Sequence, residues 1–352
     1  MKVLTVVGAR PQFIKAGPVS AAIERTGLHE VLVHTGQHHD EGMSDVFFQE
    51  LRLTTPAYNL GVHGGNHGEQ TGRMLIELER VVEQESPDAV LVYGDTNSTL
   101  AGALVAAKLH IPIAHVEAGL RSFDRTMPEE INRIVTDHVS TLLFAPTANA
   151  MEQLAREGCT KGVTLTGDVM YDAALMYADT SEGTHANQSP YVLVTIHRAA
   201  STDSIDTLRA ILEGLRQIAA AGLRVVWPLH PRTKGSIDRF ALGHLLDGLE
   251  ICSPVGYLEM NRLTAGATVV VTDSGGLQKE AYFHGVPCVT VRDTTEWVEL
   301  VDLGWNVLVP PPAADTIADT VMRVRGTTGQ LAQPYGDGHA ADRIASALSA
   351  LG

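Results

Sequence analysis

The chain has few cysteines and no long apolar run. Its 352 residues include three cysteines, Cys159, Cys252 and Cys288, which are widely spaced and form no CxxC pair. We therefore expect neither a disulfide framework nor a zinc site, and this cysteine usage fits a reducing cytoplasm. No run approaches the roughly 18 apolar residues of a membrane span. The apolar part of the N-terminal MKVLTVVGARPQFIK is too short for a signal peptide.

Positive charge is also scarce. The chain has 26 Lys and Arg against 41 Asp and Glu, which gives a formal net charge of −15. This excess argues against nucleic acid or an anionic membrane as the main partner. It does not exclude an anionic small molecule, because a few local basic residues can hold one. The hydrophobic content of 44% and the charged content of 19% are ordinary for a soluble globular protein.

Short apolar runs alternate with helical patterns along the chain. We expect strands at 2–8, 30–36, 89–94, 111–116, 140–146 and 162–167, and, beyond a polar linker at 179–190, at 191–197, 223–230, 249–255, 267–273 and 286–292. We expect helices at 11–25, 41–52, 67–85, 96–110, 147–157, from about 168, and at 337–350.

This alternation predicts an α/β fold with parallel sheets, and two runs around one linker predict two doubly wound domains with a ligand cleft between them. We expect an N-terminal domain over 1–180 with the catalytic acids and a C-terminal domain over 190–335. The C-terminal helix over 336–352 can pack back on the N-terminal domain. The length of the chain suffices for two domains.

Three acids mark the segment YGDTNSTLAGALVAAKLHIPIAHVEAGLRSFDRTMPEEINR (93–133). Asp95 and Glu117 each end a short apolar run, and ligands of open α/β sheets bind beyond the carboxyl ends of such strands. Glu129 follows Pro128 in the first turn of an expected helix. Three acids with no cysteine or metal-ligand cluster beside them indicate proton transfer. Arg121, four residues past Glu117, can offset part of their repulsion.

The segment GARPQFIK (8–15) is a candidate anion site. Gly8 allows a tight turn after the first strand, and Arg10 and Lys15 flank the start of the expected helix. The segment is not GxGxxG, so a nicotinamide site is weakly supported. The alternative is a solvated turn with two surface cations.

The segment VTDSGGLQKEAYFHGVP (271–287) is a candidate diphosphate site. Ser274, Gly275 and Gly276 open a helix directly after a strand, so their N–H groups can hold phosphate oxygens. Glu280, one turn further on, can accept hydrogen bonds from ribose hydroxyls. An ordinary glycine-containing helix start is the alternative, and the combination of strand, SGG, helix and Glu favours the functional interpretation.

Several histidines also lie at informative positions. His197 and His230 end two expected strands, each with an arginine close behind it, so they either contact a charged ligand or serve a structural role. The run at 38–40, HHD, has no HxxxH or HExxH partner, and we interpret it as a polar loop. Cys288 lies inside an apolar run and is interpreted as a packing residue.

Taken together, these motifs resemble the non-hydrolysing UDP-N-acetylglucosamine 2-epimerases and their close nucleotide-sugar 2-epimerase relatives. The resemblance covers nearly the whole chain. It rests on GARPQFIK, TGQHHDEGMSDVFF, HGEQTGRML, YGDTNST, HVEAGLRS, MPEEINR, FAPT, TGDVMYDA, TIHR, PLHPR, TDSGGLQKEA and RDTTEWVEL. It implies two Rossmann-like domains of GT-B type, a UDP-sugar substrate held between them, no cofactor, and a homodimer.

The resemblance also implies a mechanism and roles for particular residues. A base removes the C2 proton, UDP leaves C1 by anti elimination, and UDP adds back while C2 is reprotonated on the other face. The catalytic residues of the family match Asp95, Glu117, Glu129 and His197. Its UDP-binding positions match Arg10, Lys15, His230, Arg262, Ser274, Gly275, Gly276 and Glu280. Further contacts to the sugar, or to a regulatory nucleotide sugar, match Gln37, Gln70 and Arg121.

The chain departs from the family pattern at two places. Gln12 stands where the family commonly has Glu, and HRAAS (197–201) replaces HRREN or HRAEN, which puts a regulatory site in question. The segments RPQFIK and TEWVEL occur in a branch that includes epimerases of UDP-2,3-diacetamido-glucuronate. That sugar, a hydrolysing epimerase, a GT-B glycosyltransferase and a non-enzymatic nucleotide-sugar sensor are the alternatives.

Overall fold

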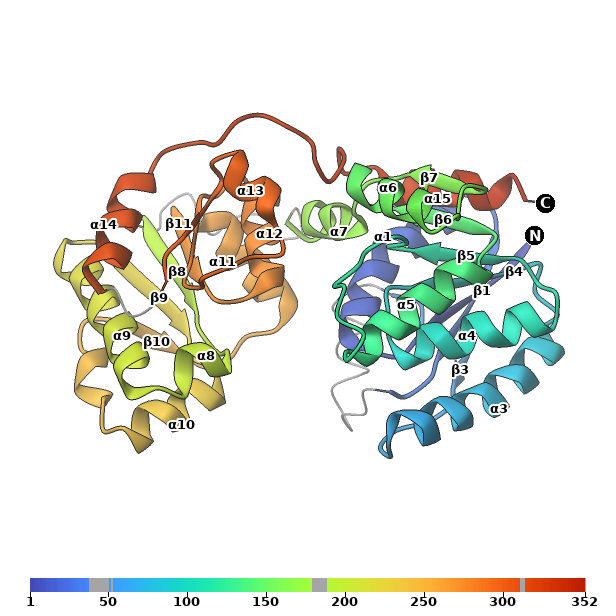
Figure 1. The fold of residues 1–352 in the computed structure, drawn as a ribbon, viewed down its shortest axis with the longest axis horizontal. Coiled ribbons are helices and arrows are strands. Elements are labelled where there is room, and N and C mark those ends of the chain that lie inside the picture. Colours follow the sequence, from blue (N-terminus) through green and yellow to red (C-terminus); the bar gives the residue numbers. More distant parts are fainter. Residues whose placement is uncertain (38–50, 52, 179–188, 311–313, 352) are drawn as a thin grey trace. The chain divides into compact units, whose positions relative to one another are not determined.

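The computed structural model describes residues 1–37, 51, 53–178, 189–310 and 314–351. The helix expected at 41–52 and most of the linker at 179–190 lie outside these ranges, apart from Leu51 and the last two linker positions. The chain divides into two compact units (Figure 1). Unit 1 comprises Met1–Ala173 and Gln333–Gly352, and unit 2 comprises Ala174–Ala332. Each unit is built on one parallel sheet, which confirms the predicted fold class.

Unit 1 contains a seven-stranded sheet in the order β3-β2-β1-β4-β5-β6-β7, with all neighbours parallel. The strands are β1 (Lys2–Val7), β2 (His29–His34), β3 (Tyr58–Asn59), β4 (Ala89–Tyr93), β5 (Ile113–Val116), β6 (Leu142–Ala145) and β7 (Val163–Leu165). The helices are α1 (Arg10–Thr26), α3 (His67–Glu85), α4 (Asn97–Lys108), α5 (Pro128–Val139), α6 (Ala148–Arg156), α7 (Val169–Ala178) and α15 (Ala340–Ser349). Helix α7 runs across the boundary between the units.

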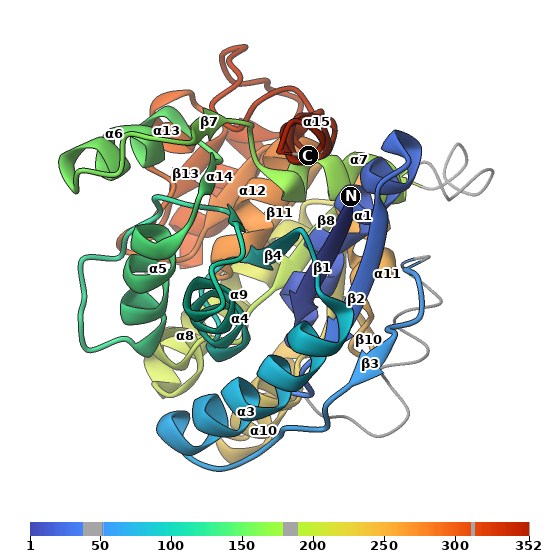
Figure 2. The same cartoon turned by 90° about the vertical axis from the view of Figure 1, so that its right-hand side faces the viewer.

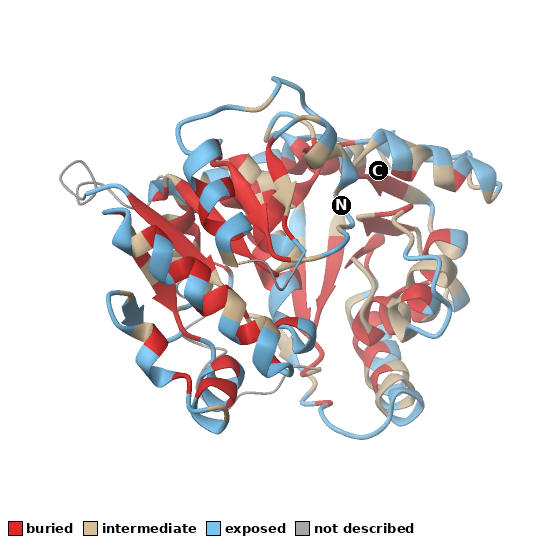
Figure 3. Ribbon diagram, turned by 60° about the vertical axis from the view of Figure 1, so that its left-hand side comes forward, coloured by how far each residue is buried: buried red, intermediate tan, exposed pale blue. Residues whose placement is uncertain are grey.

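The helices of unit 1 form packed groups around the sheet. Helix α4 packs against both α3 and α5, and α1 packs against α15 (Figure 2). The central strands are rich in Val and Leu and are buried, as expected for a parallel sheet covered on both faces (Figure 3). Val6 of β1 and Val92 of β4 pack in one core with Met74 and Leu78 of α3.

Helix α15 closes unit 1 with residues from the end of the chain. Asp172 of α7 accepts hydrogen bonds from the N–H groups of Ala340 at 3.2 Å and Ala341 at 2.8 Å, so it caps this helix. Arg343 donates to the carbonyl of Thr166 at 2.9 Å. Burial raises the pKa of Asp172 to about 6, although the two N–H groups act in the opposite direction.

Unit 2 contains a six-stranded parallel sheet in the order β10-β9-β8-β11-β12-β13. The strands are β8 (Tyr191–Thr195), β9 (Arg224–Pro228), β10 (Glu250–Cys252), β11 (Val269–Thr272), β12 (Cys288–Thr290) and β13 (Asn306–Leu308). The helices are α8 (Ala199–Thr202), α9 (Ile205–Ala220), α10 (Pro231–Arg239), α11 (Tyr257–Gly266), α12 (Gly275–Phe283), α13 (Val298–Asp302) and α14 (Ala314–Val324), with the 3₁₀ turn η1 (Gly243–Leu246). Strands β3 and β13, of two and three residues, were not among the strands predicted from the sequence.

The two sheets share one topological property. The strand order reverses between β1 and β4 in unit 1 and between β8 and β11 in unit 2. At such a switch point the two connections leave in opposite directions and open a crevice at the carboxyl ends of the strands. The sequence motifs GARPQFIK and YGDTNST follow β1 and β4, while TIHR and TDSGGLQKEA follow β8 and β11.

Gln12 joins the two strands at the switch point of unit 1. Its side chain is 2% exposed. Its Oε1 accepts from the N–H groups of Gly8 at 2.8 Å and Ala9 at 3.0 Å, and its Nε2 donates to the carbonyl of Tyr93 at 2.8 Å and to Thr99 Oγ1 at 3.0 Å. The amide thus accepts hydrogen bonds through its oxygen and donates them through its nitrogen. A glutamate, which the family resemblance leads us to expect at this position, has no N–H to give to the Tyr93 carbonyl.

We predict that Gln12→Met lowers the free energy of unfolding by about 1–3 kcal/mol, since buried N–H groups lose their acceptor while the side-chain volume is nearly kept. Urea denaturation measures the change. Gln84→Met on the exposed face of α3 is the matched control, and it is expected to change stability by less than about 0.5 kcal/mol. Equal effects of the two substitutions would contradict the role given to Gln12.

Candidate active site

Asp95 and Glu117 lie at the carboxyl edge of neighbouring strands in unit 1. Tyr93 of β4 pairs with Val116 of β5, and Glu117 follows this pair directly, while Asp95 lies two residues beyond β4. Glu117 has a φ of 68°, a left-handed conformation that is unusual for a residue with a side chain. Such backbone strain persists only where the surroundings hold it in place, and it is frequent at functional sites.

Each of these two acids is paired with a cation. The ammonium of Lys15 on α1 binds the carboxylate of Glu117, and the guanidinium of Arg133 on α5 binds the carboxylate of Asp95. Burial lowers the pKa of Lys15, but Glu117, Asp168 and Asp95 together outweigh it, so the net shift is upward. Lys15 therefore stays charged between these acids. Its implied contact with UDP stays a prediction.

Helix α5 begins at Pro128, as predicted, and places Glu129 in its first turn. Asn132 and Arg133, three and four residues further on, share the helix face of Glu129. Asn132 donates to the Asp95 carbonyl at 2.9 Å, so this face lies toward the turn that carries Asp95. Arg133 and Asn132 were not identified from the sequence. The helical spacing from Glu129 is the signal that points to them.

Gln37 and Gln70 both hold the start of α4. Oε1 of Gln37 accepts from the N–H of Ser98 at 3.0 Å and from its hydroxyl at 2.6 Å. Oε1 of Gln70 accepts from the amide of Asn97 at 2.9 Å. The two glutamines thus organise the helix that follows Asp95. Their contacts with a sugar stay a prediction.

Arg10 and Arg121, the two arginines of unit 1 among the predicted site residues, differ in exposure. Arg10 is exposed at the first residue of α1. The side chain of Arg121 is only 2% exposed, and it binds Asp137 at 2.8 Å and Glu157 at 2.6 Å rather than Glu117. Contacts of Arg10 with UDP and of Arg121 with a sugar stay predictions.

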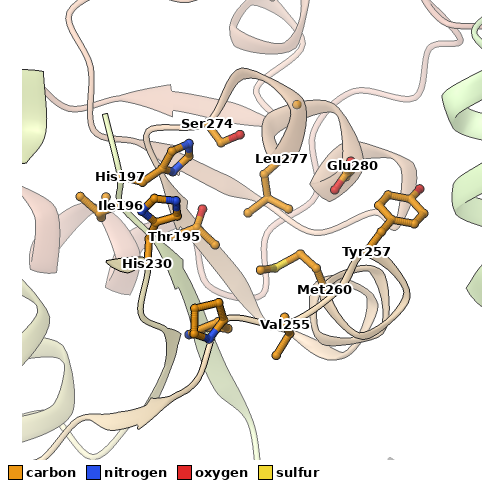
Figure 4. A pocket seen from close by; sticks show the side chains of 14 residues that line it. Thr195, Ile196, His197, His230, Val255, Tyr257, Met260, Ser274, Leu277 and Glu280 are labelled. Atoms are coloured by element: carbon orange, nitrogen blue, oxygen red, sulfur yellow. The ribbon is translucent and has the colours of Figure 1, made fainter. Parts of the chain in front are cut away.

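Unit 2 has a cavity of about 390 Å³ at the carboxyl edge of β8 and β11 (Figure 4). This volume is within the range of small-ligand sites, about 300–1,000 Å³. His197, His230 and Ser274 lie together at one end of it. Met260 and Leu277 provide an apolar surface further along. A cavity with one polar end and one apolar wall suits a ligand that has a charged part and a flat, less polar part.

His197 is held by a buried aspartate that the sequence did not single out. Asp273 follows β11 and accepts from Nδ1 of His197 at 3.2 Å and from the N–H of Arg198 at 2.8 Å. Although burial raises the pKa of Asp273, these hydrogen bonds lower it below the usual value. The ionised carboxylate therefore keeps a proton on Nδ1 and leaves Nε2 of His197 to face a ligand.

His230 lies beside His197, with ring centroids 5.5 Å apart. Its Nδ1 accepts from the N–H of Arg232 at 3.1 Å and caps α10, so its Nε2 carries the proton in the neutral ring. Burial lowers the pKa of His230, and His197 and Arg232 lower it further. The two histidines lie two residues beyond the ends of β8 and β9, close to the strand ends that the sequence indicated.

The start of α12 opens onto the same cavity. Ser274 is its N-cap, and a Cβ on Gly276 would find its nearest neighbour, Ser274 Oγ, 4.0 Å away. A ligand can therefore approach the backbone closely at Gly276, and helix N-termini favour anions. Gly275 has less space, since a Cβ there would lie 3.4 Å from the carboxylate of Glu296.

Glu280 lines the cavity one turn along α12. Burial raises the pKa of its carboxyl to about 7, and Lys279 acts in the opposite direction. Arg262, on α11, binds Glu259. Its contact with UDP stays a prediction.

The described ranges contain no group of three or more His, Cys, Asp or Glu side chains arranged to hold a metal ion. Within the same ranges, every helix is too short or too polar to cross a lipid bilayer.

Two doubly wound units, one with charge-paired acids and the other with a cavity of about 390 Å³, give the chain a GT-B-like α/β architecture. Residues 21–349 match the family model described as UDP-N-acetylglucosamine 2-epimerase. The chain therefore belongs to the UDP-N-acetylglucosamine 2-epimerase family, whose members are isomerases. This finding confirms the resemblance that the sequence motifs indicated.

Individual relatives cover the whole chain. It is 54% identical to a UDP-2,3-diacetamido-2,3-dideoxy-D-glucuronate 2-epimerase of Pseudomonas aeruginosa, over 100% of both chains. It is 42% identical to the solved UDP-GlcNAc 2-epimerase of Methanocaldococcus jannaschii, with a TM-score of 0.92 over 99% of this chain and 100% of that one. The structure of that enzyme in complex with UDP-GlcNAc and UDP matches with a TM-score of 0.82 over the same shares.

We predict that Glu280→Gln stabilises the protein at pH 8 and not at low pH. The folded pKa of about 7 lies above the ordinary glutamate pKa of 4.5, so protonated Glu280 contributes stability below pH 4.5 that is lost as the pH rises through 7. A neutral amide avoids this loss. Each pKa unit corresponds to about 1.4 kcal/mol, so the gain at pH 8 is on the order of 1–3 kcal/mol.

Urea denaturation at pH 8 and pH 4.5 measures this difference. Glu213→Gln, at an exposed position on α9, is the matched control and should give the same small change at both pH values. A Glu280→Gln gain that is independent of pH would exclude ionisation of this carboxyl as its cause.

Proposed function

We propose that the chain catalyses the non-hydrolysing C2 epimerisation of a UDP-2-acetamido sugar, with UDP-N-acetylglucosamine converted to UDP-N-acetylmannosamine. One observation carries the proposal. Asp95 and Glu117 stand at one sheet edge, each held by its own cation, so two carboxylates are fixed in place as candidate bases. Removing a proton from carbon requires such a positioned base.

The reaction proceeds by elimination and re-addition. A base takes the proton from C2, the electron pair of that C–H bond forms the C1–C2 double bond, and the C1–O bond breaks with its electrons leaving on UDP. UDP then adds back to C1, and C2 receives a proton on the opposite face. We assign these proton transfers to Asp95, Glu117 and Glu129, assisted by His197. Elimination and re-addition leave the oxidation state unchanged, so the reaction requires no redox cofactor.

The departing UDP needs a site of its own. We assign this role to the cavity of unit 2, where the N-terminus of α12 at Ser274 and Gly276 and the Nε2–H of His230 offer N–H groups to a diphosphate. Glu280 accepts from the ribose hydroxyls. Its carboxyl titrates near pH 7, and UDP binding favours the ionised form.

The identity of the sugar follows the solved relatives. The Methanocaldococcus jannaschii enzyme was solved with UDP-GlcNAc and UDP, and a Neisseria meningitidis enzyme, 29% identical, was solved with UDP-GlcNAc. The Pseudomonas aeruginosa relative acts, by its name, on a sugar that also carries an acetamido group at C2. The chemistry at C2 is the same for both sugars, so the test includes both.

The decisive assay is incubation with UDP-N-acetylglucosamine in D₂O, followed by NMR of the sugar. We expect the C2 epimer with deuterium at C2 and UDP still attached. Free UDP with N-acetylmannosamine would show a hydrolysing epimerase. No change with either UDP-N-acetylglucosamine or UDP-2,3-diacetamido-glucuronate would refute the proposal and leave a transferase or a sensor.

We predict that Asp95→Asn and Glu117→Gln each lower turnover by about two or more powers of ten, the usual scale of general acid–base catalysis, while UDP still binds. Deuterium wash-in at C2 and calorimetry with UDP measure the two effects. Glu152→Gln, at an exposed position on α6, is the control and should exchange at the wild-type rate. If Asp95, Glu117 and Glu129 amide variants all exchange normally, the proton carriers lie elsewhere, and His197 is the first candidate.

We also propose that the chain acts in the cytoplasm as a homodimer. Phe123 is 75% exposed, Ile131 is 43% exposed and Met127 is 39% exposed, so the loop before α5 and its first turns present apolar surface of the kind that a second copy covers. The three cysteines are unpaired, which fits a reducing compartment. Light scattering should give twice the 37.7 kDa of one chain, and a mass of one chain would refute the dimer.

A further inference from the structure

A buried carboxylate of α5 contacts the turns that follow β4 and β5. Asp137 is 1% exposed, and its side chain accepts from Nδ1 of His115 at 2.7 Å, from the N–H of Gly119 at 3.1 Å and from Arg121 at 2.8 Å. The other ring nitrogen of His115 lies 2.7 Å from the carbonyl of Gly94. Asp137 thus contacts the turn after β5 directly at Gly119, and it reaches the turn after β4 through the imidazole of His115.

These two turns carry the proposed proton carriers. Gly94 immediately precedes Asp95, and Gly119 lies two residues after Glu117. Gly94, Glu117 and Gly119 have φ values of 61°, 68° and 83°, so both turns depend on left-handed backbone. For Glu117 this conformation is strained and must be held by its surroundings. The hydrogen bonds of His115 and Asp137 hold this backbone at Gly94 and at Gly119, respectively.

The charges in the network favour this arrangement. Burial raises the pKa of Asp137, but His115 and Arg121 outweigh it and bring the pKa below its usual value, so the carboxylate is ionised. Each ring nitrogen of His115 faces an oxygen, that of Asp137 on one side and that of the Gly94 carbonyl on the other, so the ring bridges the two. Arg121 also binds Glu157 at 2.6 Å, so its orientation toward Asp137 is fixed from the other side.

We propose that Asp137 is a positioning residue that sets the backbone of both acid-bearing turns, through His115 for Asp95 and through Gly119 for Glu117. This inference rests on the proposed function, since it assumes that these two acids move protons. Asp137 itself is enclosed and acts only through the residues it holds. A misplacement of about 1 Å in a catalytic group can cost about 100-fold in rate, so the loss of this anchor should appear in turnover.

The test compares three variants. Asp137→Ala removes both links. Asp137→Asn can keep both links. Its side-chain oxygen can accept from Gly119 and Arg121, while its NH₂ group donates to a neutral His115. His115→Leu cuts only the link to Gly94. Leu78→Ala, in the core of unit 1 and away from the turns, is a control for loss of stability alone.

The first readout is hydrogen exchange, which does not require activity. In Asp137→Ala we expect faster deuterium uptake by peptides covering 94–99 and 117–122, and in His115→Leu by the first peptide only. Asp137→Asn and Leu78→Ala should keep wild-type uptake in both peptides. Wild-type uptake in Asp137→Ala would overturn the proposal, whether or not the protein proves to be an epimerase.

The second readout is kinetic. We expect Asp137→Ala to lower kcat about 10- to 100-fold while the UDP Kd changes less than twofold, with most of the rate restored in Asp137→Asn. Combining Asp137→Ala with Glu117→Gln should cost less than the product of the single effects, because both act on the same step. A kcat loss in Leu78→Ala of equal size, or multiplicative effects in the double variant, would overturn the positioning role. An inactive wild type would refute the proposed function and leave the exchange result to decide this inference.

Discussion

The salt bridge between Lys15 and Glu117 connects α1 to the end of β5. The strand order and helix packing of unit 1 hold these two residues in contact. An ion pair removed from water gains little unless further groups compensate the lost hydration. Here Asp95 and Asp168 add negative charge around Lys15, and together with Glu117 they raise its pKa. Gln12 fixes the start of α1, from which Lys15 extends, against the end of β4. The position of the base thus depends on the parallel alignment of β1, β4 and β5.

The two units use one topology for different chemistry. An aspartate follows the strand at each switch point, Asp95 after β4 and Asp273 after β11. Asp95 binds Arg133 and is one-third exposed, whereas Asp273 is fully buried and directs a histidine toward the cavity. The difference lies in the residues that follow. TNST begins a helix whose N–H groups are occupied by Gln37 and Thr96, while SGG leaves the start of α12 approachable.

The sequence predicted the strands near the sites, the positions of Asp95 and Glu117 at their ends, and the glycine-rich start of α12. It did not identify Asp137 or Asp273, because their contacts join residues 18 and 76 positions apart, and no local pattern records such a contact. Arg133 was missed as well, although its helical spacing from Glu129 points to it. Arg121 was expected to offset the charge of Glu117 from four residues away. That spacing brings side chains together only on a helix, and the segment between them is a turn and extended loop, so Arg121 reaches Asp137 and Glu157 instead.

The return of the chain end to unit 1 has a consequence for how the protein is made. Unit 2 is a continuous stretch, Ala174–Ala332, whereas unit 1 needs residues from Gln333 onward to provide α15, its cap at Asp172 and its packing against α1. A ribosome adds about 5–20 residues per second, so the N-terminal part waits roughly ten seconds or more for its last helix. During that interval the surface of α1 that α15 will cover is open. The unit synthesised first is therefore the last to be completed.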